Sequence, residues 1–207
     1  FNQLQSLRLY YQFSNISMDR YVIDGQYRQI FLAPRELNTD KLTEKAKTWI
    51  NLHLKYTHGY GVVVAPVNEV TPEGQPKLMV RNIPPTTDTD LILTRPEIYF
   101  GLLTDQYIIT GTDEDEFDYP SGSDNTETRY EGIDGISLGG ANRLLYAITQ
   151  RSLRLLFSDN ITTDSRIHHT RDVIDRAAKI APFLIYENDP YMVMNQENGK
   201  LYWIVDA

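Results

Sequence analysis

The clearest pattern in the chain is an apolar run without polar alternation, from Val62 to Ala65. Such a run predicts a strand that is covered on both faces and therefore lies centrally in a sheet. Before it, residues 39–57 repeat apolar side chains at spacings of three and four, which predicts a helix that begins at Asn38 or Thr39. Gly59 suits the left-handed position that follows a helix, and residues 71–74 carry the proline and glycine of a type I turn.

Strand patterns dominate both ends of the chain. Asp24-Gly25 and Asn198-Gly199 each predict a tight hairpin turn, the second of type I′. Residues 75–95 and the polar run 113–125 predict surface loops, and an antiparallel pair is expected around a turn at Thr104-Asp105. Segments rich in β-branched and aromatic residues predict the strands, at residues 7–11, 21–23, 27–32, 98–103, 106–110, 126–130, 183–186, 191–194 and 201–205.

Two further helices are expected late in the chain. Residues 142–157 are rich in leucine with an imperfect apolar face, and residues 162–181 have Thr162 as N-cap and Pro182 as the stop. Strands first, helices grouped late and strands again predict an α+β fold with a largely antiparallel or mixed sheet, about three main helices and a C-terminal β-hairpin. A single domain over residues 1–207 is the preferred interpretation, and two subdomains divided near residues 131–142 are the alternative.

Charge and composition exclude several classes of function. Twenty Lys and Arg against 28 Asp and Glu give a net charge of −8, which argues against nucleic-acid binding because phosphate contacts need clustered cations. The chain has no cysteine, so thiol nucleophiles, disulfides and thiolate metal sites are excluded. The sequence contains no phosphate-binding loop, nucleophile elbow or dinucleotide fingerprint, and no cofactor is predicted.

Polar residues around the central strand are candidates for general acid–base chemistry. His58 precedes the strand, Glu69 follows it, and Glu36 belongs to an upstream segment that could join the same pocket. The alternative is that His58 caps a helix, that Glu69 lies in a turn, and that Arg35 and Glu36 form an internal ion pair. Convergence of the three candidates in an open pocket would indicate an enzyme, whereas burial of His58 against packed tyrosines would indicate a binding module.

Two sets of residues are candidates for binding. Arg151 and Arg154 accompany several leucines, a basic and apolar combination that favours contact with anionic headgroups or with a membrane part of the protein. An ordinary core helix with solvated arginines is the alternative. Tyr56 and Tyr60, which flank His58, and Arg35, in the segment that could join the same pocket, are candidates for binding. A groove that stacks on sugars or holds an extended peptide could be lined by the tyrosines that alternate along strands, which are Tyr10, Tyr21, Tyr27, Tyr99, Tyr107, Tyr191 and Tyr202. Tyrosines also pack at the edges of sheets, which is the competing interpretation.

The acidic loop offers oxygen ligands of the kind that calcium takes, but its spacing does not match an EF-hand loop. A solvated hairpin tip is the preferred interpretation, and no metal site is predicted. His168 and His169 are adjacent, so on a helix they would point about 100° apart and could not share one ion. They are expected at the surface. The metal candidates in the loop are Asp113, Asp115, Asp118 and Asp124.

Several segments, in order along almost the whole chain, carry a resemblance to one bacterial family. They are YVIDGQYRQIFLAPREL, YTHGYGVVVAPVNEVTPEGQP, TRPEIYFG, EFDYPSG, ITTDSRI with KIAPFL, and DPYMV with LYWIVDA. The chain thereby resembles uncharacterised protein family 0182, large polytopic membrane proteins with a soluble region after their spanning helices. The resemblance implies no established activity and no catalytic residues.

What the resemblance implies is an extracytoplasmic domain of a longer membrane protein at the cell membrane. No window of the sequence approaches the roughly 20 apolar residues of a membrane span, so the spanning helices are expected upstream of Phe1. The sequence favours a non-catalytic binding or assembly module and leaves an enzyme open, the alternative being an envelope hydrolase or transferase. The expected partners are the protein's own transmembrane domain, lipid headgroups or envelope components.

Overall fold

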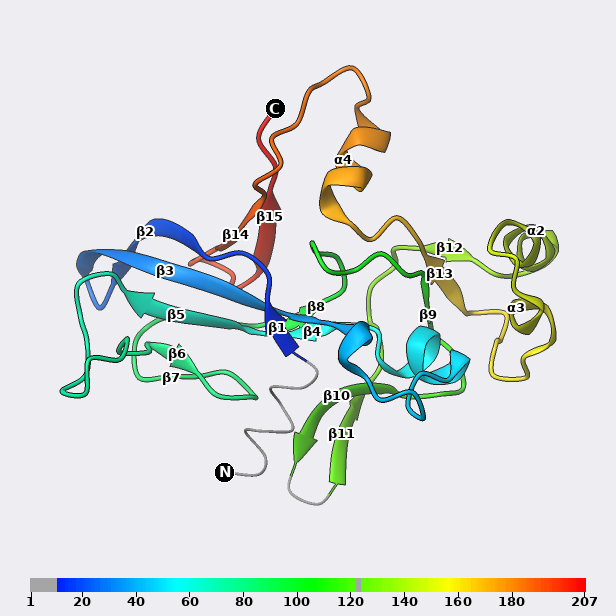
Figure 1. The fold of residues 1–207 in the computed structure, drawn as a ribbon, viewed down its shortest axis with the longest axis horizontal. Helices are drawn as coiled ribbons and strands as arrows, with labels where there is room; N and C mark the ends of the chain where they lie inside the picture. The colour runs from blue at the N-terminus through cyan, green and yellow to red at the C-terminus, as the bar shows by residue number, and fades with distance from the viewer. Residues whose placement is uncertain (1–10, 122–123) are drawn as a thin grey trace. The chain divides into compact units, whose positions relative to one another are not determined.

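The computed structural model describes residues 11–121 and 124–207 (Figure 1). Its described residues form two compact units, each assembled from separate stretches of the chain. Unit 1 contains Asn38–Thr57 and Asp105–Arg171, and unit 2 contains Tyr11–Leu37, His58–Thr104 and Asp172–Ala207. Each unit has a hydrophobic cluster of its own.

The main sheet of unit 2 is built around one long strand, β3 (Gln26–Leu37). Its strand order is β1-β3-β5-β6-β7, with β2 pairing on β3, and every pairing is antiparallel. The hairpin turn between β2 and β3 has Asp24 and Gly25 at φ 52° and 71°, as a type I′ turn requires. The other strands are β1 (Tyr11–Phe13), β2 (Ser17–Ile23), β5 (Val62–Pro66), β6 (Val80–Arg81) and β7 (Thr86–Thr87).

Alternation along these strands places the core of unit 2 on one face of the sheet. Ile30 and Leu32 of β3 and Val62 and Val64 of β5 are fully buried there. The unit also contains three further pieces of secondary structure. They are the pair β4 (Gly59–Tyr60) with β8 (Glu97–Ile98), the C-terminal hairpin β14 (Tyr191–Met194) with β15 (Leu201–Ile204), and helix α4 (Val173–Ile180).

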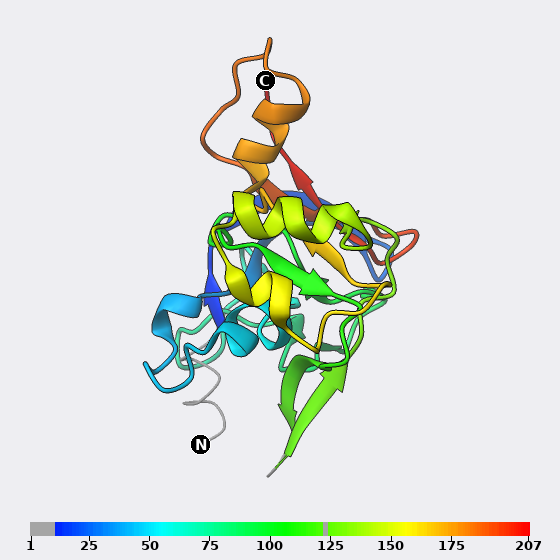
Figure 2. The ribbon, with the colours of Figure 1, turned by 90° about the vertical axis from the view of Figure 1, so that its right-hand side faces the viewer.

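Unit 1 has a small antiparallel sheet in the order β12-β13-β9, with helices α2 and α3 on one side of it, facing the viewer in Figure 2. Its core joins Ile109 and Ile167 of the sheet to Ala147 of α2 and Leu155 of α3. The elements are β9 (Ile108–Thr110), β12 (Ile136–Ser137), β13 (Arg166–His168), α2 (Ala141–Thr149), α3 (Leu153–Phe157), the hairpin β10 (Glu116–Ser121) with β11 (Asp124–Thr128), and two short helical turns, η1 (Thr39–Lys41) and η2 (Asn51–Lys55).

The α+β class, the antiparallel pairing, the central strand over Val62–Ala65 and both predicted hairpins are confirmed. In the C-terminal hairpin only Gly199 has a positive φ, 65°, so its turn is not type I′. Residues 71–74 form the predicted turn, closed by Gly74 N donating to Thr71 O at 2.9 Å. Of the strand expected at residues 7–11, all but Tyr11 lies outside the described residues.

The continuous helix predicted over residues 39–57 is wrong, and a helix forms only over residues 49–55. The chain there forms the single turn η1, a further turn near Ala46, and η2, a short π-helix, which together bury Trp49 and Leu54. Gly59 is not a helix cap either. It lies in β4, where a Cβ would overlap the Arg35 carbonyl, so glycine allows β4 to approach β3 closely.

The helix predicted over residues 162–181 is also wrong in its first half. Residues 166–168 are strand β13, and α4 begins only after Asp172, whose side chain accepts hydrogen bonds from Ile174 N and Asp175 N at 2.9 Å each. The true N-cap is therefore Asp172 rather than Thr162. The expected helix over 142–157 divides into α2 and α3 because Arg151 adopts φ 50°.

Three strand assignments also change. Residues 98–103 and 106–110 do not pair, since β8 pairs with β4 and β9 pairs with β13. Residues 183–186 are not a strand, since the chain turns at residues 182–184 and continues without regular structure, and the expected loop over 75–95 includes the short β6–β7 hairpin. No helix among residues 11–121 and 124–207 is long and apolar enough to cross a bilayer.

Candidate functional site

Glu36 is a buried structural carboxylate near the end of β3. Its side chain is fully buried, and its two oxygens accept hydrogen bonds from Leu102 N at 3.0 Å and Leu103 N at 2.9 Å. A Cβ at Gly101 would overlap this carboxylate, so the glycine is what allows it to reach the backbone. Both oxygens of Glu36 are thus engaged by the fold, and the ion pair expected with Arg35 is not formed.

Arg35 precedes Glu36 in β3, and its side chain therefore points to the opposite face of the sheet. It is only 8% exposed, and within the described residues its side chain forms no hydrogen bond or ion pair. Its Nη1 is completely covered by protein. Burial lowers the pKa of the guanidinium to about 10, because the charged form is separated from water.

His58 lies in an aromatic environment inside unit 2. It is 1% exposed, and its Nδ1 lies 3.1 Å from the Gly59 carbonyl oxygen. Its ring centroid is 4.9 Å from that of Tyr99 and 6.4 Å from that of Tyr60. Tyr60 is itself buried. The histidine is therefore enclosed by tyrosines rather than presented to an open pocket.

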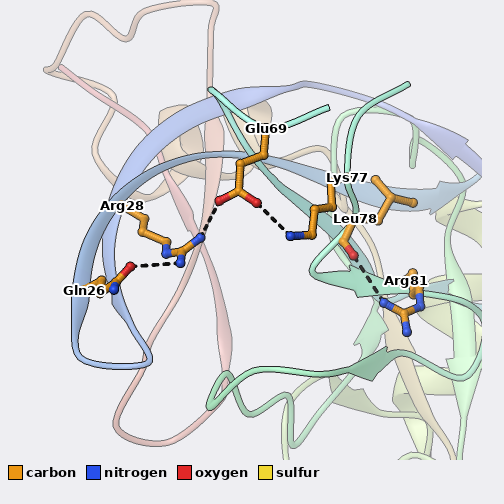
Figure 3. A network of polar contacts seen from close by, with 6 residues as sticks. All are labelled: Gln26, Arg28, Glu69, Lys77, Leu78 and Arg81. Carbon is orange, nitrogen blue, oxygen red and sulfur yellow. Dashed lines mark hydrogen bonds and ion pairs between the residues drawn. The ribbon is translucent and has the colours of Figure 1, made fainter. Parts of the chain in front are cut away.

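Glu69 lies at the opposite end of β3, in the ion-pair network of Figure 3. Its carboxylate is 2.6 Å from Arg28 Nη1 and 2.9 Å from Lys77 Nζ, and the hydrogen bond from Lys77 is the main reason that its pKa is lowered. A hollow of about 340 Å³ adjoins this network. Arg28 and Glu36 are eight positions apart on β3, or about 26 Å at 3.3 Å per residue.

Distance and burial therefore separate the three catalytic candidates. Glu69 lies at one end of β3 and Glu36 at the other, and the Glu36 oxygens are held by backbone amides. The two binding candidates Tyr56 and Tyr60 belong to different units. Tyr56 belongs to unit 1, where its ring meets Phe117 edge-on at 5.3 Å, and Tyr60 belongs to unit 2.

The described residues contain no group of three or more His, Asp or Glu side chains arranged to hold a metal ion. Asp115 pairs with Arg129 at 2.5 Å. The other three acidic candidates are dispersed along the loop and hairpin: Asp113 donates its N–H to Asn160 O, Asp118 is buried in β10, and Asp124 begins β11.

The expectation that His168 lies at the surface is wrong. It is 2% exposed in β13, and its Nε2 lies 2.9 Å from Thr110 Oγ1 of the neighbouring strand. His169 is half-buried, with Nε2 at 3.3 Å from Tyr146 Oη. A helix over this segment would have exposed both rings, and the strand places one of them inside the unit.

Sequence reasoning missed a buried polar network in unit 1. Glu116 accepts hydrogen bonds from Thr57 Oγ1 and from Tyr130 N, and Arg171 donates to Thr57 O at 2.5 Å and to Gln106 O at 3.3 Å. Glu116, Thr57 and Arg171 are all buried. Thr57 and Arg171 are 114 positions apart and meet through a backbone carbonyl, so no local spacing could have indicated the contact.

Arg151 and Arg154 lie on a surface with many exposed apolar side chains, formed by α2 and α3 in unit 1. These helices bury only Ala147 and Leu155, while five large apolar side chains are between 50% and 73% exposed. Both arginines are exposed beside them. We call this set the α2–α3 surface, and its residues are Leu144, Leu145, Ile148, Arg151, Leu153, Arg154 and Phe157.

Arg143 holds the α2–α3 surface in place. Its guanidinium donates to the carbonyl oxygens of Leu155 at 2.8 Å, Ser158 at 2.6 Å and Ile161 at 3.3 Å. The side chain therefore connects α2 to α3 and to the segment after it, and it is not available to a ligand. The exposed apolar side chains accordingly stand on a preorganised pair of helices.

Comparison with known proteins identifies relatives over the whole chain. It is 56% identical over 207 residues to a UPF0182 protein of Alkaliphilus metalliredigens, 50% identical over 208 residues to one of Desulforamulus reducens, and 49% identical over 207 residues to one of Clostridium acetobutylicum. All of this chain is covered in each case, but only 22% to 23% of the relative. The chain thus spans less than a quarter of the length of these curated relatives.

No solved structure matches the chain. The model of the Uncharacterised protein family (UPF0182) matches residues 1–207, which is the whole sequence. The chain belongs to the Uncharacterised protein family (UPF0182).

Proposed function

We propose that the chain is a non-catalytic binding and assembly module of a membrane protein, located on the extracytoplasmic face of the cell membrane. In this proposal the α2–α3 surface packs against a membrane part of the same polypeptide. The supporting observation is the cluster of five exposed large apolar side chains on two adjacent helices. Single exposed apolar residues are normal on proteins, whereas a contiguous group of them marks a site of interaction.

The length of the relatives supports a partner within the same polypeptide. Because this chain covers 22% of the Alkaliphilus protein, more than three quarters of that polypeptide lies outside it. A partner that is covalently attached is present at high effective concentration, so a surface of modest size is sufficient for a stable contact. Arg151 and Arg154 would then lie at the border of the contact, where they can meet acidic groups of the partner.

The geometry of the catalytic candidates supports a module over an envelope hydrolase or transferase. His58 is enclosed by tyrosines, and Glu36 is hydrogen-bonded through both oxygens to the backbone. Glu69 is engaged in surface ion pairs at the far end of β3. General acid–base catalysis requires such groups within hydrogen-bond reach of one substrate, and these three are not arranged in that way.

Site-specific cross-linking in the full-length protein tests the proposal. A photoreactive amino acid replaces Ile148 on the α2–α3 surface, and the control replaces Ile133, which is 86% exposed on the same unit but outside that surface. We expect position 148 to cross-link to segments of the polypeptide outside these 207 residues, and position 133 to do so several-fold less.

The partners named as alternatives give different products. Cross-linking of position 148 to lipid alone would replace the polypeptide partner with the bilayer surface, and binding to anionic liposomes that is lost in Arg151→Glu with Arg154→Glu would support that outcome. Cross-linking to envelope polymer alone would indicate that partner instead. Equal and unspecific labelling at positions 148 and 133 would refute a docking role for the α2–α3 surface.

A further inference from the structure

Arg35 differs from every other arginine that the structure describes as buried or half-buried. The others all have hydrogen-bond acceptors, which include carboxylates for Arg28 and Arg81 and backbone carbonyls for Arg143, Arg166 and Arg171. Arg35 is 8% exposed, against 4% for Arg171, but has no acceptor among the described residues. A buried guanidinium without an acceptor is costly, because the charge loses its hydration without compensation.

Among residues 11–121 and 124–207, no carboxylate forms an ion pair with Arg35. The adjacent carboxylate, Glu36, points to the other face of β3 and is bound to the Leu102 and Leu103 amides. The residues outside the described ranges, 1–10 and 122–123, contain no Asp or Glu in their sequence. These residues therefore supply no carboxylate that could neutralise Arg35.

The surroundings of Arg35 are shaped by small and rigid residues. Gly61 has φ 73°, and a Cβ there would lie 3.3 Å from Arg35 Nη1 and 2.6 Å from Pro85 Cγ, so only glycine fits between them. Phe13, which pairs with Arg35 across β1 and β3 and so shares its face, is 49% exposed. The side chain that neighbours Arg35 on this face is thus half open to solvent.

We propose that Arg35 is an oxyanion-binding residue, whose Nε and Nη2 donors, which unlike Nη1 are not completely covered, receive a carboxylate or phosphate group from outside these 207 residues. Such groups match the planar donors of arginine in a two-point contact, which a lysine cannot reproduce. The site lies on the face of β3 opposite Glu36 and is formed by Arg35, Gly61, Pro85 and the cross-strand neighbour Phe13. It is independent of the α2–α3 surface and does not rest on the assembly role.

Thermal unfolding of the 207-residue chain in inorganic phosphate, against chloride at the same ionic strength, tests the site. A ligand at ten times its dissociation constant raises the folded-to-unfolded ratio about elevenfold, so a saturable rise of the midpoint is expected in the wild type. Arg35→Met should abolish the rise, and Arg35→Lys should need at least tenfold more phosphate. Arg28→Met is the matched control, because Arg28 is on the same strand with Glu69 as partner, and it should retain the response.

In chloride, Arg35→Met should have a midpoint no lower than the wild type, because the change removes a buried charge without an acceptor. An equal phosphate response in wild type and Arg35→Met, or none in the wild type, would overturn the proposal.

Measurements on the full-length protein distinguish the possible sources of the anion. A phosphate response that persists there indicates a free or lipid phosphate, whereas its loss, with a lower midpoint for Arg35→Met, indicates a carboxylate of the same polypeptide. A full-length midpoint unaffected by both phosphate and Arg35→Met would also overturn it.

Discussion

Apolar side chains are buried on the inner face of the unit 2 sheet, whereas they are exposed on the α2–α3 surface of unit 1. Leu32 of β3 is fully buried between its neighbours, whereas Leu145 of α2 is 58% exposed. Apolar burial stabilises a fold in proportion to the area removed from water, so the sheet contributes strongly to stability and the exposed helix face contributes little. The difference indicates that the inner face of the sheet supports the fold, and it leaves the α2–α3 surface free for the contact that we propose.

The largest expected effect comes from shortening a side chain on the inner face of the sheet. Leu32→Ala should lower the free energy of unfolding by about 2–5 kcal/mol, because the change leaves a cavity in a region that is fully buried. Denaturant unfolding of the 207-residue chain measures the change. The matched control, Leu145→Ala, should change the same quantity by less than about 0.5 kcal/mol. Comparable losses of unfolding free energy in the two variants would show that the two regions contribute equally to stability.

A smaller effect is expected at the buried carboxylate of the same strand. Glu36→Gln keeps the shape but replaces one acceptor oxygen with an amide group, which would face a backbone N–H of Leu102 or Leu103. Leaving that donor unsatisfied should cost about 1–3 kcal/mol in the free energy of unfolding. The measurement is the same denaturant series, with Glu69→Gln as a half-buried control in surface ion pairs that should cost clearly less than Glu36→Gln. An equal cost for both would show that burial of Glu36 is not what makes it important.

Local signals explain which parts of the fold could be predicted. The Asp24-Gly25 turn and the Val62–Ala65 run are short patterns whose structure follows from their own residues, and both were predicted. The helix over 39–57 failed because apolar spacings of three and four are also satisfied by separate turns that bury Trp49 and Leu54. Residues 166–168 became a strand because partners distant in sequence, β9 and β12, pair with them.

The candidate site, like the fold, was predictable from the sequence only in part. The sequence placed Arg151 and Arg154 beside leucines, but nothing in it indicated that Arg143 is engaged by three carbonyls of the following segment. The isolation of Arg35 could not be predicted, since it depends on Glu36 turning to the amides of a loop 66 positions away. Contacts to backbone atoms leave no pattern in the sequence of side chains.

Replacing an exposed residue of the α2–α3 surface sharpens the contrast between fold and contact. Ile148→Ser should leave the free energy of unfolding of the 207-residue chain within about 0.5 kcal/mol of the wild type, because Ile148 is 66% exposed. In the full-length protein the same change should lower the thermal midpoint, since there the side chain is expected to be covered. Thr128→Ser, on the β10–β11 hairpin, is the control and should change neither. Destabilisation of the 207-residue chain itself would show that Ile148 supports the fold.

The smallest expected effect is a pH dependence confined to unit 1. Burial lowers the pKa of His53 below its ordinary value of 6.5, against the opposing effect of the Tyr107 carbonyl, and the charges of Arg171 and Arg154 lower it further. Above pH 6.5 the ring is neutral in both the folded and the unfolded state. Below pH 6.5 the unfolded chain binds a proton that the folded chain does not bind, so the free energy of unfolding should fall as the pH decreases. His53→Gln should flatten the dependence of the free energy of unfolding between about pH 7 and pH 5. Identical slopes in wild type and variant would mean that another group controls this range, and that the core beneath α2 does not respond to pH through His53.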